Sequence, residues 1–291
     1  MLKLEATTEQ RREKTELVLA NIYTLPPIPK AMTGAMKLLD NSAVCISTIT
    51  NIISKDQGLV TKILTIANSP IYGLQRKVTS IDFAVMVLGF TELKNIISVL
   101  SMADAFKSKT DSLNQKDFWL HSYITGSGAK RLSEEIGLGN SGEIFVAGLL
   151  HDLGINIIQR YFKPEFRAIN EMVKSNEIGY LEAEEQVLGL THQEMGQFLI
   201  NKWNLPESLG ETIAFHHQPS TLKDNVELAS IVHLADFMTQ RLEVGCFQWD
   251  DDIKLDKNII DILKFRNESN LNRFMDSHAE LFKSQLLSVT F

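Results

Sequence analysis

The sequence predicts an all-α protein, organised as a multi-helix bundle. Apolar residues recur three and four positions apart along most of the chain, for example at Ile144, Ala147, Leu150, Ile157 and Ile158, and this is the spacing of helices packed on a core. Runs that alternate between apolar and polar residues are few, so strands are not expected. Proline, glycine and Asn-Ser signals divide the pattern into segments of helix length.

Proline residues and one polar stretch divide the predicted helices into parts. The LPPIP sequence at Leu25–Pro29 ends the first helix, because proline disfavours helix in the residue before it and removes a hydrogen-bond donor. The polar stretch Lys107–Lys116 (KSKTDSLNQK) separates the two halves of the chain. The resulting parts are an N-terminal helix (1–24), an N-terminal helical half (25–110), a second helical half (111–245) and a C-terminal helical tail (246–291).

The N-terminal half reads as short helices separated by turns. Thr79, with Asp82 three residues later, resembles a capping box, in which each residue satisfies a free backbone N–H of the other. This pair is expected to open a helix at Ile81–Leu88. Gly89 then interrupts the pattern before the next predicted helix, Leu93–Phe106.

The second half carries longer helical patterns with clear start signals. Thr191 with Glu194 forms another capping-box pattern, so His192 falls in the first turn of its helix. Gly142–Tyr161 is strongly apolar, and it places the adjacent pair His151–Asp152 in the middle of a helical pattern. The predicted helices are 117–136, 142–161, 164–176, 179–188, 192–203, 206–217 and 226–242, followed by helix-like segments between 258 and 287.

The bulk composition points to a cytoplasmic globular protein. The net charge is −7 and the sequence pI is near 5.6, so a broad attraction to nucleic acid or to an anionic membrane is not expected. No apolar run reaches the length of a membrane span, and the first residues lack the apolar core of a signal peptide. Cys45 and Cys246 are far apart and fit no metal or redox spacing, which favours reduced thiols in a cytoplasm.

Histidine and aspartate residues suggest a metal site. His151 and Asp152 lie in an apolar pattern, where unpaired polar groups are costly, so both need partners. Asp117 lies one helical turn before His121, and Asp236 lies in another apolar helix. A divalent metal would satisfy such residues, and nitrogen and oxygen ligands without thiolate suit one to three ions of Fe, Mn, Zn, Ni or Mg. The candidate ligands are Asp117, His121, His151, Asp152, His192, His216, His217 and Asp236.

The order of these ligands resembles the ligand series of the HD superfamily of metal-dependent phosphohydrolases, in the extended form of the HD-GYP cyclic-dinucleotide phosphodiesterases. Other stretches are more specific, and they resemble the HDOD family, which is HD-related and concerned with output in signalling. These stretches are LPPIP (25–29), DQGLVTKILTIANSPIYG (56–73), SIDFAVMVLGF (80–90) and WNLPESLGETIAFHHQP (203–219). The resemblance implies an N-terminal helical subdomain packed on an HD-like helical subdomain that holds the metal.

The sequence departs from the HD-GYP pattern in three places. Ile155 stands where those enzymes usually carry a lysine, which would help to bind a phosphate. Residues 218–220 (QPS) replace their Gly-Tyr-Pro segment, and Asp117 stands where the enzymes with three metal ions carry glutamate. Metal binding is therefore expected, whereas catalysis is not assured. Glu185, seven residues before His192, is either a carboxylate beside the site or an ordinary solvated helix residue.

These features leave two main functions open, with a third between them. The HDOD resemblance favours a standalone regulatory protein of signal transduction, with a protein partner and with divalent ions that fix its helices. The alternative is a metal-dependent phosphohydrolase acting on a nucleotide or cyclic dinucleotide, in which His151, Asp152 and His192 are the candidate catalytic residues. The third is a sensor that binds a nucleotide at the metal without cleaving it.

Overall fold

The computed structural model describes residues 7–22, 38, 45–55, 57–68, 72, 76–106, 115–176, 178–203, 205–245, 249 and 253–285. Every regular element within these ranges is a helix, which confirms the predicted all-α class. The turn signal at Leu25–Pro29 and residues 107–114 of the predicted polar boundary lie outside the described residues. The division of the chain into parts at 24, 110 and 245 therefore stays a prediction.

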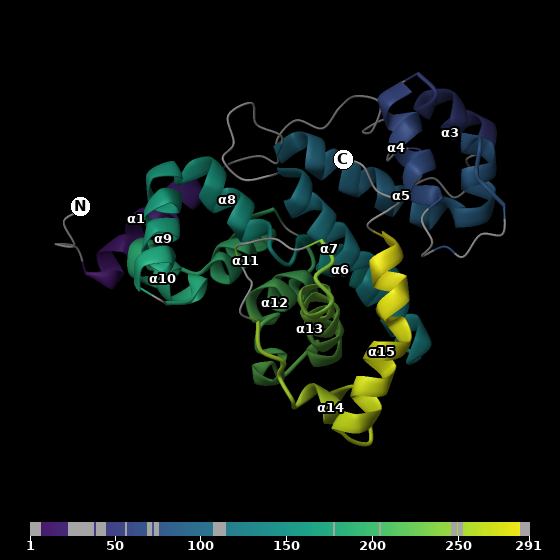
Figure 1. Cartoon of the computed structure of the whole chain (residues 1–291). Coiled ribbons are helices and arrows are strands. Elements are labelled where there is room, and N and C mark those ends of the chain that lie inside the picture. Colours follow the sequence, from purple (N-terminus) through teal and green to yellow (C-terminus); the bar gives the residue numbers. More distant parts are fainter. Residues whose placement is uncertain are drawn as a thin grey trace.

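The first helices after the N-terminal one form a group at one end of the molecule, at the upper right of Figure 1. This group consists of α3 (Ile46–Ile53), α4 (Gln57–Ala67) and α5 (Ile81–Phe106), and α5 contacts both α3 and α4. The backbone of α5 leaves helical geometry at Gly89, whose φ is 77°. The predicted interruption at this glycine is thus a kink between two helical segments.

The start of α5 corrects the predicted capping box. The hydroxyl of Ser80, rather than that of Thr79, accepts the hydrogen bond from the backbone N–H of Phe83, at 3.2 Å. The carboxylate of Asp82 instead accepts a hydrogen bond from the hydroxyl of Thr50, at 2.7 Å. Asp82 therefore ties α5 to α3, and the cap lies one residue later than its local pattern predicted.

The second half of the chain forms the larger group of helices, with α6 packed along α7 and α13 in its middle (Figure 1). Because α5 packs on α7, the N-terminal helical group contacts this larger group, as the predicted fold class requires. The helices of the larger group are α6 (Gln115–Glu135), α7 (Ser141–Leu150), α8 (Leu153–Tyr161), α9 (Lys163–Asn176), α10 (Tyr180–Leu188), α11 (His192–Lys202), α12 (Glu207–Phe215), the 3-10 turn η2 (Pro219–Thr221), α13 (Val226–Arg241), α14 (Ile259–Ile262) and α15 (Glu268–Gln285).

The N-terminal helix α1 (Thr8–Ala20) packs on α10 and α11, at the opposite end of the molecule from α3 and α4 (Figure 1). The hydroxyl of Thr15 donates to the carbonyl of Leu188 at 2.7 Å, and the amine of Lys202 donates to the carbonyl of Leu19 at 3.1 Å. Although α1 precedes the N-terminal half in sequence, it is packed as a part of the second half.

The apolar stretch Gly142–Tyr161 is broken in the middle, so the prediction of one continuous helical pattern is wrong. Helix α7 ends at Leu150, α8 begins at Leu153, and His151 and Asp152 form the turn between them. Among the described residues, Ser141–Tyr161 is the one stretch long and apolar enough to cross a membrane, but 78% of it is buried inside the protein. It is therefore packed as a core element of the bundle.

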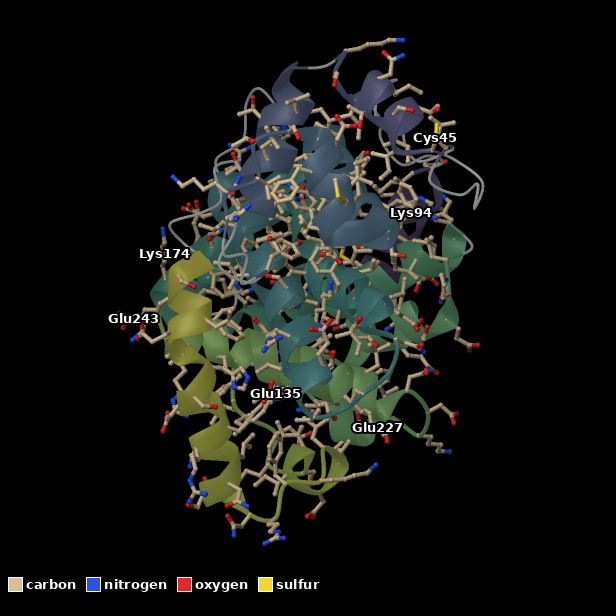
Figure 2. The ribbon with its side chains drawn as sticks, turned by 90° about the vertical axis from the view of Figure 1, so that its right-hand side faces the viewer. Cys45, Lys94, Glu135, Lys174, Glu227 and Glu243 are labelled. Carbon is tan, nitrogen blue, oxygen red and sulfur yellow. The ribbon has the colours of Figure 1, made fainter. Side chains whose placement is uncertain are left out.

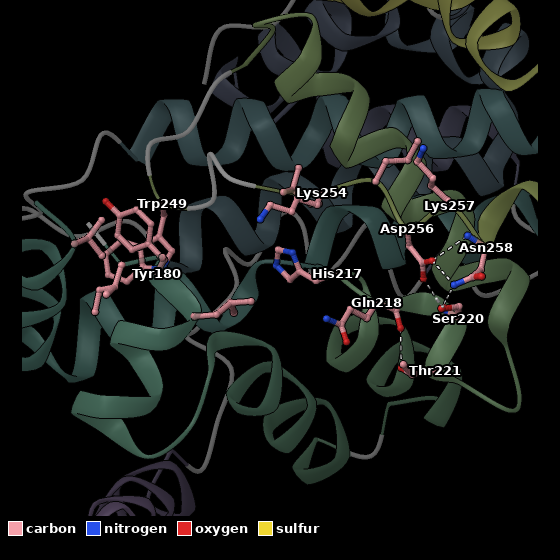
Figure 3. Close-up of a pocket in the computed structure, with 16 residues that line it drawn as sticks. Tyr180, His217, Gln218, Ser220, Thr221, Trp249, Lys254, Asp256, Lys257 and Asn258 are labelled. Atoms are coloured by element: carbon pink, nitrogen blue, oxygen red, sulfur yellow. Dashed lines mark hydrogen bonds between the residues drawn. The ribbon is translucent and has the colours of Figure 1, made fainter. Parts of the chain in front are cut away.

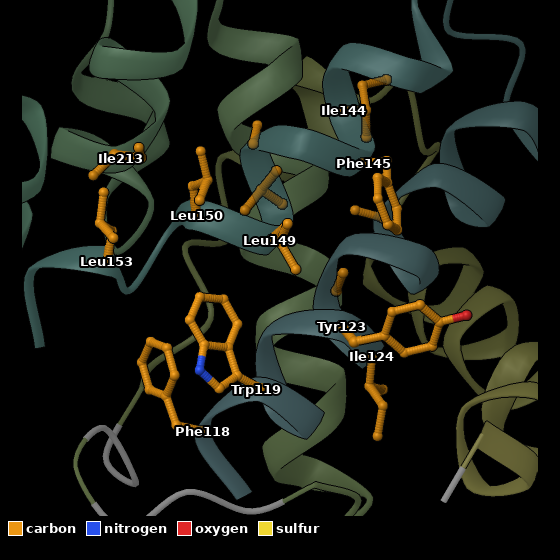
Figure 4. Packing of buried hydrophobic residues seen from close by; sticks show 14 of the residues in the cluster. Phe118, Trp119, Tyr123, Ile124, Ile144, Phe145, Leu149, Leu150, Leu153 and Ile213 are labelled. Carbon is orange, nitrogen blue, oxygen red and sulfur yellow. The ribbon is translucent and has the colours of Figure 1, made fainter. Parts of the chain in front are cut away.

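The close approach of α6 to α7 depends on two glycines that face each other. A Cβ atom on Gly126 would lie 2.7 Å from the carbonyl oxygen of Phe145, and a Cβ atom on Gly148 would lie 2.7 Å from the Cα atom of Gly126. Figure 4 shows Tyr123 and Phe145 beside this contact, with their rings edge to face at 6.3 Å. This approach sets the spacing between His121 on α6 and the turn that follows α7.

Charged residues lie mainly on the outside of the bundle. Figure 2 shows Lys174, Glu227 and Glu243 projecting from the surface, and all three are exposed. The histidines and aspartates of the candidate metal site are buried instead, with the exceptions of Asp117 and His217, which are half-buried. Burying ionisable histidines and aspartates costs free energy unless they are paired or bind a metal.

Candidate metal centre

The turn between α7 and α8 presents His151 and Asp152 to the interior, and neither side chain is exposed. The Nδ1 atom of His151 lies 2.7 Å from the carbonyl oxygen of Gly148, which accepts its hydrogen. Because Nδ1 makes this hydrogen bond, Nε2 is the nitrogen that would bind a metal ion. The break in the helix therefore turns a pair of adjacent residues toward one interior space.

A first group of donor atoms meets at this turn from three directions. It consists of His121 on α6, His151 and Asp236 on α13. The Nε2 atom of His121 lies 3.3 Å from Nε2 of His151 and 3.2 Å from Oδ1 of Asp236. Residues more than a hundred positions apart in the sequence thus place their donor atoms together.

A second group of donor atoms lies beside the first. It consists of His192 at the start of α11 and the pair His216 and His217 at the end of α12. The Nε2 atoms of His192 and His217 lie 3.4 Å apart. Nδ1 of His216 lies 2.8 Å from the carbonyl oxygen of Ile213, so its Nε2 atom faces the group.

The carboxylate of Asp152 lies between the two groups. Its Oδ2 atom is 3.2 Å from Nε2 of His151 and 3.5 Å from Nε2 of His121. Its Oδ1 atom is 3.5 Å from Nε2 of His216 and 3.7 Å from Nε2 of His192. The three longer separations exceed the usual hydrogen-bond range, and neither oxygen has a hydrogen-bond partner in the described part of the chain.

The donor atoms fit divalent metal ions. Within the described residues, both carboxylate oxygens of Asp236 and Nε2 of His216 are also buried without a hydrogen-bond partner. Donors that share one ion at about 2.0–2.2 Å are at most about 4.4 Å apart. The donor atoms of each group lie within 4.8 Å of one another, so small movements would bring them to an ion. A metal would satisfy buried atoms that nothing else in this part of the structure satisfies.

The electrostatics of the cluster favour the metal-binding forms of the two aspartates and of His216, but the protonated form of His121. Burial opposes the charged form of His121, but the carboxylates of Asp152 and Asp236 outweigh burial and raise its pKa to about 9. Burial alone would raise the pKa values of both carboxyl groups, but the adjacent His151 and the other imidazoles lower them. Burial and a neighbouring histidine lower the pKa of His216 to about 4. The aspartates are therefore anionic and His216 is neutral near pH 7.

Glu184 on α10 orients His192 and was missed in the sequence. Its carboxylate accepts from the backbone N–H of His192 at 2.7 Å and lies 3.0 Å from Nδ1 of the same residue. The indole Nε1 of Trp249 donates to the other side of this carboxylate at 2.5 Å. The sequence pointed to Glu185 instead, and Glu185 is exposed. The available signal was position, because Glu184 lies one turn before the buried Leu188.

Gly154 lets the starts of α8 and α11 meet. A Cβ atom at this position would lie 1.9 Å from the carbonyl oxygen of His192, closer than any real contact. The contact brings the turn that carries Asp152 to the helix start that carries His192. The spacing between the two donor groups therefore depends on one residue that has no side chain.

Two sequence-derived assignments stand apart from the cluster. Asp117, on α6 one turn before His121, is half-buried and belongs to none of the donor groups found among the described residues. Its role as a ligand stays a prediction. Ile155, where HD-GYP enzymes have lysine, is fully buried in the apolar core and offers no charge to a ligand.

His233 supports the cluster from behind. Its Nδ1 atom lies 2.7 Å from the carbonyl oxygen of His216, and its Nε2 atom accepts from the backbone N–H of Asp256 at 2.9 Å. His233 thereby fixes the backbone at the end of α12 and anchors the segment that follows residue 253. These contacts give His233 a structural role, and it belongs to none of the donor groups found among the described residues.

Comparison with known proteins decides the family. The sequence model of the HDOD domain matches residues 25–219 of this chain, more than half of its length. The chain belongs to the HDOD family. The HDOD match ends just after His217, so α13 with Asp236 and the segment with Trp249 follow the matched region.

Relatives of known sequence or structure agree with this assignment. An uncharacterized protein of Treponema pallidum (strain Nichols) is 25% identical over 266 residues, which are 91% of this chain and 51% of that protein. The chain thus spans about half the length of this relative. The crystal structure of an HDOD domain protein of unknown function from Geobacter sulfurreducens is 26% identical, with a TM-score of 0.71, and the match covers 97% of this chain and 93% of that one.

A second solved structure has the same fold at lower identity. It is a protein of Shewanella amazonensis SB2B whose name describes it as a candidate metal-dependent phosphohydrolase. The two chains are 19% identical with a TM-score of 0.66, and the match covers 95% of this chain and 98% of that one. At this identity the likeness shows the fold alone.

Proposed function

We propose that this HDOD protein is a regulatory protein of signal transduction that holds a centre of two divalent metal ions. His121, His151 and Asp236 would hold one ion, and a second group of three histidines would hold the other; these are His192, His216 and His217. Asp152 would bridge the two ions. The observation that carries the proposal is the position of Asp152, with one oxygen toward each group and neither oxygen hydrogen-bonded within the described residues.

The donor set narrows the choice of metal. Imidazole nitrogens outnumber carboxylate oxygens in the two groups, and this mixture suits Fe, Mn, Zn or Ni better than Mg. Bound ions of this kind supply Lewis acidity and lower the pKa of a bound water. The residues of the chain position the donor atoms, because α6, α7, α11, α12 and α13 meet at one point.

A regulatory role follows from this arrangement. Ligands that come from several helices fix the relative positions of those helices when the metal is bound. The fixed bundle would then present one surface to a protein partner. Loss of metal would let the helices move and would change that surface. A partner protein is therefore part of the proposal.

Elemental analysis of protein purified without added metal tests the centre. We expect two equivalents of a transition metal per chain in the wild type and fewer than one in Asp152→Asn, because the amide cannot bridge two cations as a carboxylate does. Asp224→Asn is the matched control, since Asp224 is exposed and belongs to none of the donor groups found among the described residues. Protein without metal in the wild type, or equal contents in all three proteins, would overturn the proposal.

Hydrolysis of a phosphate ester is the second candidate, and one observation favours it. His217 is half-buried and lines a cavity of about 670 Å³, so a solute can approach the second donor group. A panel of nucleotides, cyclic dinucleotides and a generic phosphodiester, assayed with Mn, Fe and Mg, tests it. Turnover that is lost in His151→Ala would favour the enzyme, whereas silence across the panel would leave the regulatory role alone.

A further inference from the structure

A cavity of about 670 Å³ lies beside the metal centre, on the side of His217 (Figure 3). Its walls come from the start of α10, from the 3-10 turn η2 and from residues 253–258, which precede α14. One part of the wall is apolar and includes Val173, Ile178 and Leu181. The volume lies in the range of about 300–1,000 Å³ that is usual for small-molecule sites.

His217 connects the cavity to the metal centre. It belongs to the second donor group and also lines the cavity, whereas its neighbours His192 and His216 are completely buried. A molecule in the cavity would therefore approach the centre from the side of His217. His217 is the donor residue that also belongs to the described lining of the cavity.

Lys254 supplies a positive charge at this junction. Its side chain is exposed, lines the cavity and extends toward His217 in Figure 3. It forms no ion pair with any residue that the structure describes. The neighbouring cation is already paired, because the amine of Lys257 lies 3.2 Å from a carboxylate oxygen of Glu268.

The carboxylate of Asp256, in the same wall, already accepts hydrogen bonds from the chain. The carboxylate of Asp256 accepts hydrogen bonds from the backbone N–H of Ser220 at 3.1 Å and from the backbone N–H of Asn258 at 3.0 Å. These bonds, with burial opposing them, lower the pKa of Asp256. Lys254 is therefore the charged group in the described wall whose bonding capacity is left for a ligand.

Trp249 joins the cavity wall to the donor set. Its ring is stacked between Phe166 and Tyr180, with centroid distances of 4.7 and 4.6 Å. Its indole Nε1 donates to Glu184, and the same carboxylate holds His192. A ligand that touches the wall at Trp249 is thus two hydrogen bonds away from the centre.

We infer that the cavity binds a phosphate-bearing small molecule of about the size of a mononucleotide. The phosphate would lie between Lys254 and the ions of the centre, and the organic part would lie along the apolar wall. An ammonium group and divalent cations are the usual partners of a phosphate. Lys254 would thereby supply the charge that Ile155 lacks, from a segment beyond the HDOD match. This inference rests on the metal centre proposed above.

Binding of adenosine monophosphate to the full chain tests the inference, after the metal content has been measured. Calorimetry on metal-loaded protein compares the wild type, Lys254→Met and Lys257→Met. We expect Lys254→Met to weaken binding at least tenfold and Lys257→Met to weaken it less than threefold, because Lys257 is already paired. Adenosine, which lacks the phosphate, is expected to bind at least tenfold more weakly than the monophosphate.

The outcomes separate this inference from the proposed function. Wild-type protein without metal would overturn the metal centre, and the elemental analysis shows this before any nucleotide is added. Metal-loaded protein that binds the monophosphate equally well with and without Lys254 would overturn the cavity assignment alone. The same conclusion would follow if neither adenosine monophosphate nor inorganic phosphate bound to the metal-loaded wild type.

Discussion

A single carboxylate, that of Glu184, decides which nitrogen of His192 faces the centre. Since it holds the backbone N–H and Nδ1 of His192, Nε2 is left to bind an ion. We predict that Glu184→Gln lowers metal affinity by about 10- to 100-fold, the usual effect of removing such a partner. A chelator competition titration measures this effect.

The control for this prediction is the adjacent residue. Glu185→Gln changes the same type of side chain on the same helix, but Glu185 is exposed. It should leave metal affinity within about twofold of the wild type, as expected for a surface substitution. Equal losses in both variants would show that Glu184 does not act through His192.

His121 gives the centre a pH dependence. Its pKa is raised to about 9, so near pH 7 it holds a proton when no metal is bound. A metal ion must displace this proton, and metal affinity should therefore rise from pH 7 to pH 9. Calorimetry with Mn²⁺ in two buffers of different ionisation enthalpy should detect release of a proton near pH 7. Affinity that is equal at pH 7 and pH 9 would contradict this reading.

The types of the candidate ligands and their order along the chain predicted most of the site. Helix periodicity alone could not show which side chains face the interior. All predicted ligands except Asp117 fall in the donor groups, and Asp152 forms a further group with His151 and His216 that joins the other two. Glu184 could not be distinguished from Glu185 by type, because the distinction depends on which face of α10 packs inward. That face is set by packing on the neighbouring α9 and on α1, which is distant in sequence.

At the scale of helices, the approach of α8 to α11 decides whether the two donor groups meet. A Cβ atom on Gly154 would lie 1.9 Å from the backbone oxygen of His192, which cannot move away as a side chain can. We predict that Gly154→Ala destabilises the protein by about 1–3 kcal/mol or more, as overpacking does, and lowers its metal content. Urea denaturation and elemental analysis measure the two effects.

Gly139→Ala is the control for this helix contact. A Cβ atom at Gly139 would meet nothing within 4 Å, so its variant should fold and bind metal like the wild type. If Gly154→Ala behaved like Gly139→Ala, the close approach of α8 to α11 would not depend on the missing side chain at Gly154. The role given to Gly154 would then be wrong.

The apolar periodicity predicted that these segments are helical. It did not predict where a helix breaks. The apolar pattern continues through 142–161 without a proline or a strong turn signal, yet the chain turns at His151–Asp152. The turn directs two adjacent side chains to one interior space, which a continuous helix would not do because adjacent residues diverge by about a hundred degrees. The break depends on the contacts of His151 and Asp152 with residues distant in sequence, so the local apolar pattern did not reveal it.

At the scale of the whole molecule, the centre joins helices that are far apart in sequence. Its donors come from α6, the turn after α7, α11, the end of α12 and α13. Local pattern could not predict this, nor could it predict that α1 packs on α10 and α11. Both arrangements depend on long-range packing. The meeting of the donor residues was predicted only from the resemblance of their order to the ligand order of the HD superfamily.

Removal of metal should therefore destabilise the whole chain. Ligand that exceeds its dissociation constant 100- to 1,000-fold adds about 2.7–4.1 kcal/mol of stability. For a chain of this size we predict a fall in Tm of roughly 5–15 °C after chelation, with recovery when metal is restored. Calorimetric scans of both forms measure it, and unchanged melting after verified metal loss would contradict a structural role for the ions.

Anomalous X-ray diffraction from metal-loaded crystals tests the central claim most directly. The predicted result is two peaks per chain on opposite sides of the Asp152 carboxylate. One peak would lie among His121, His151 and Asp236, and the other among the three remaining histidines. A single peak elsewhere, or no peak at the carboxylate, would contradict a two-ion centre in this HDOD protein.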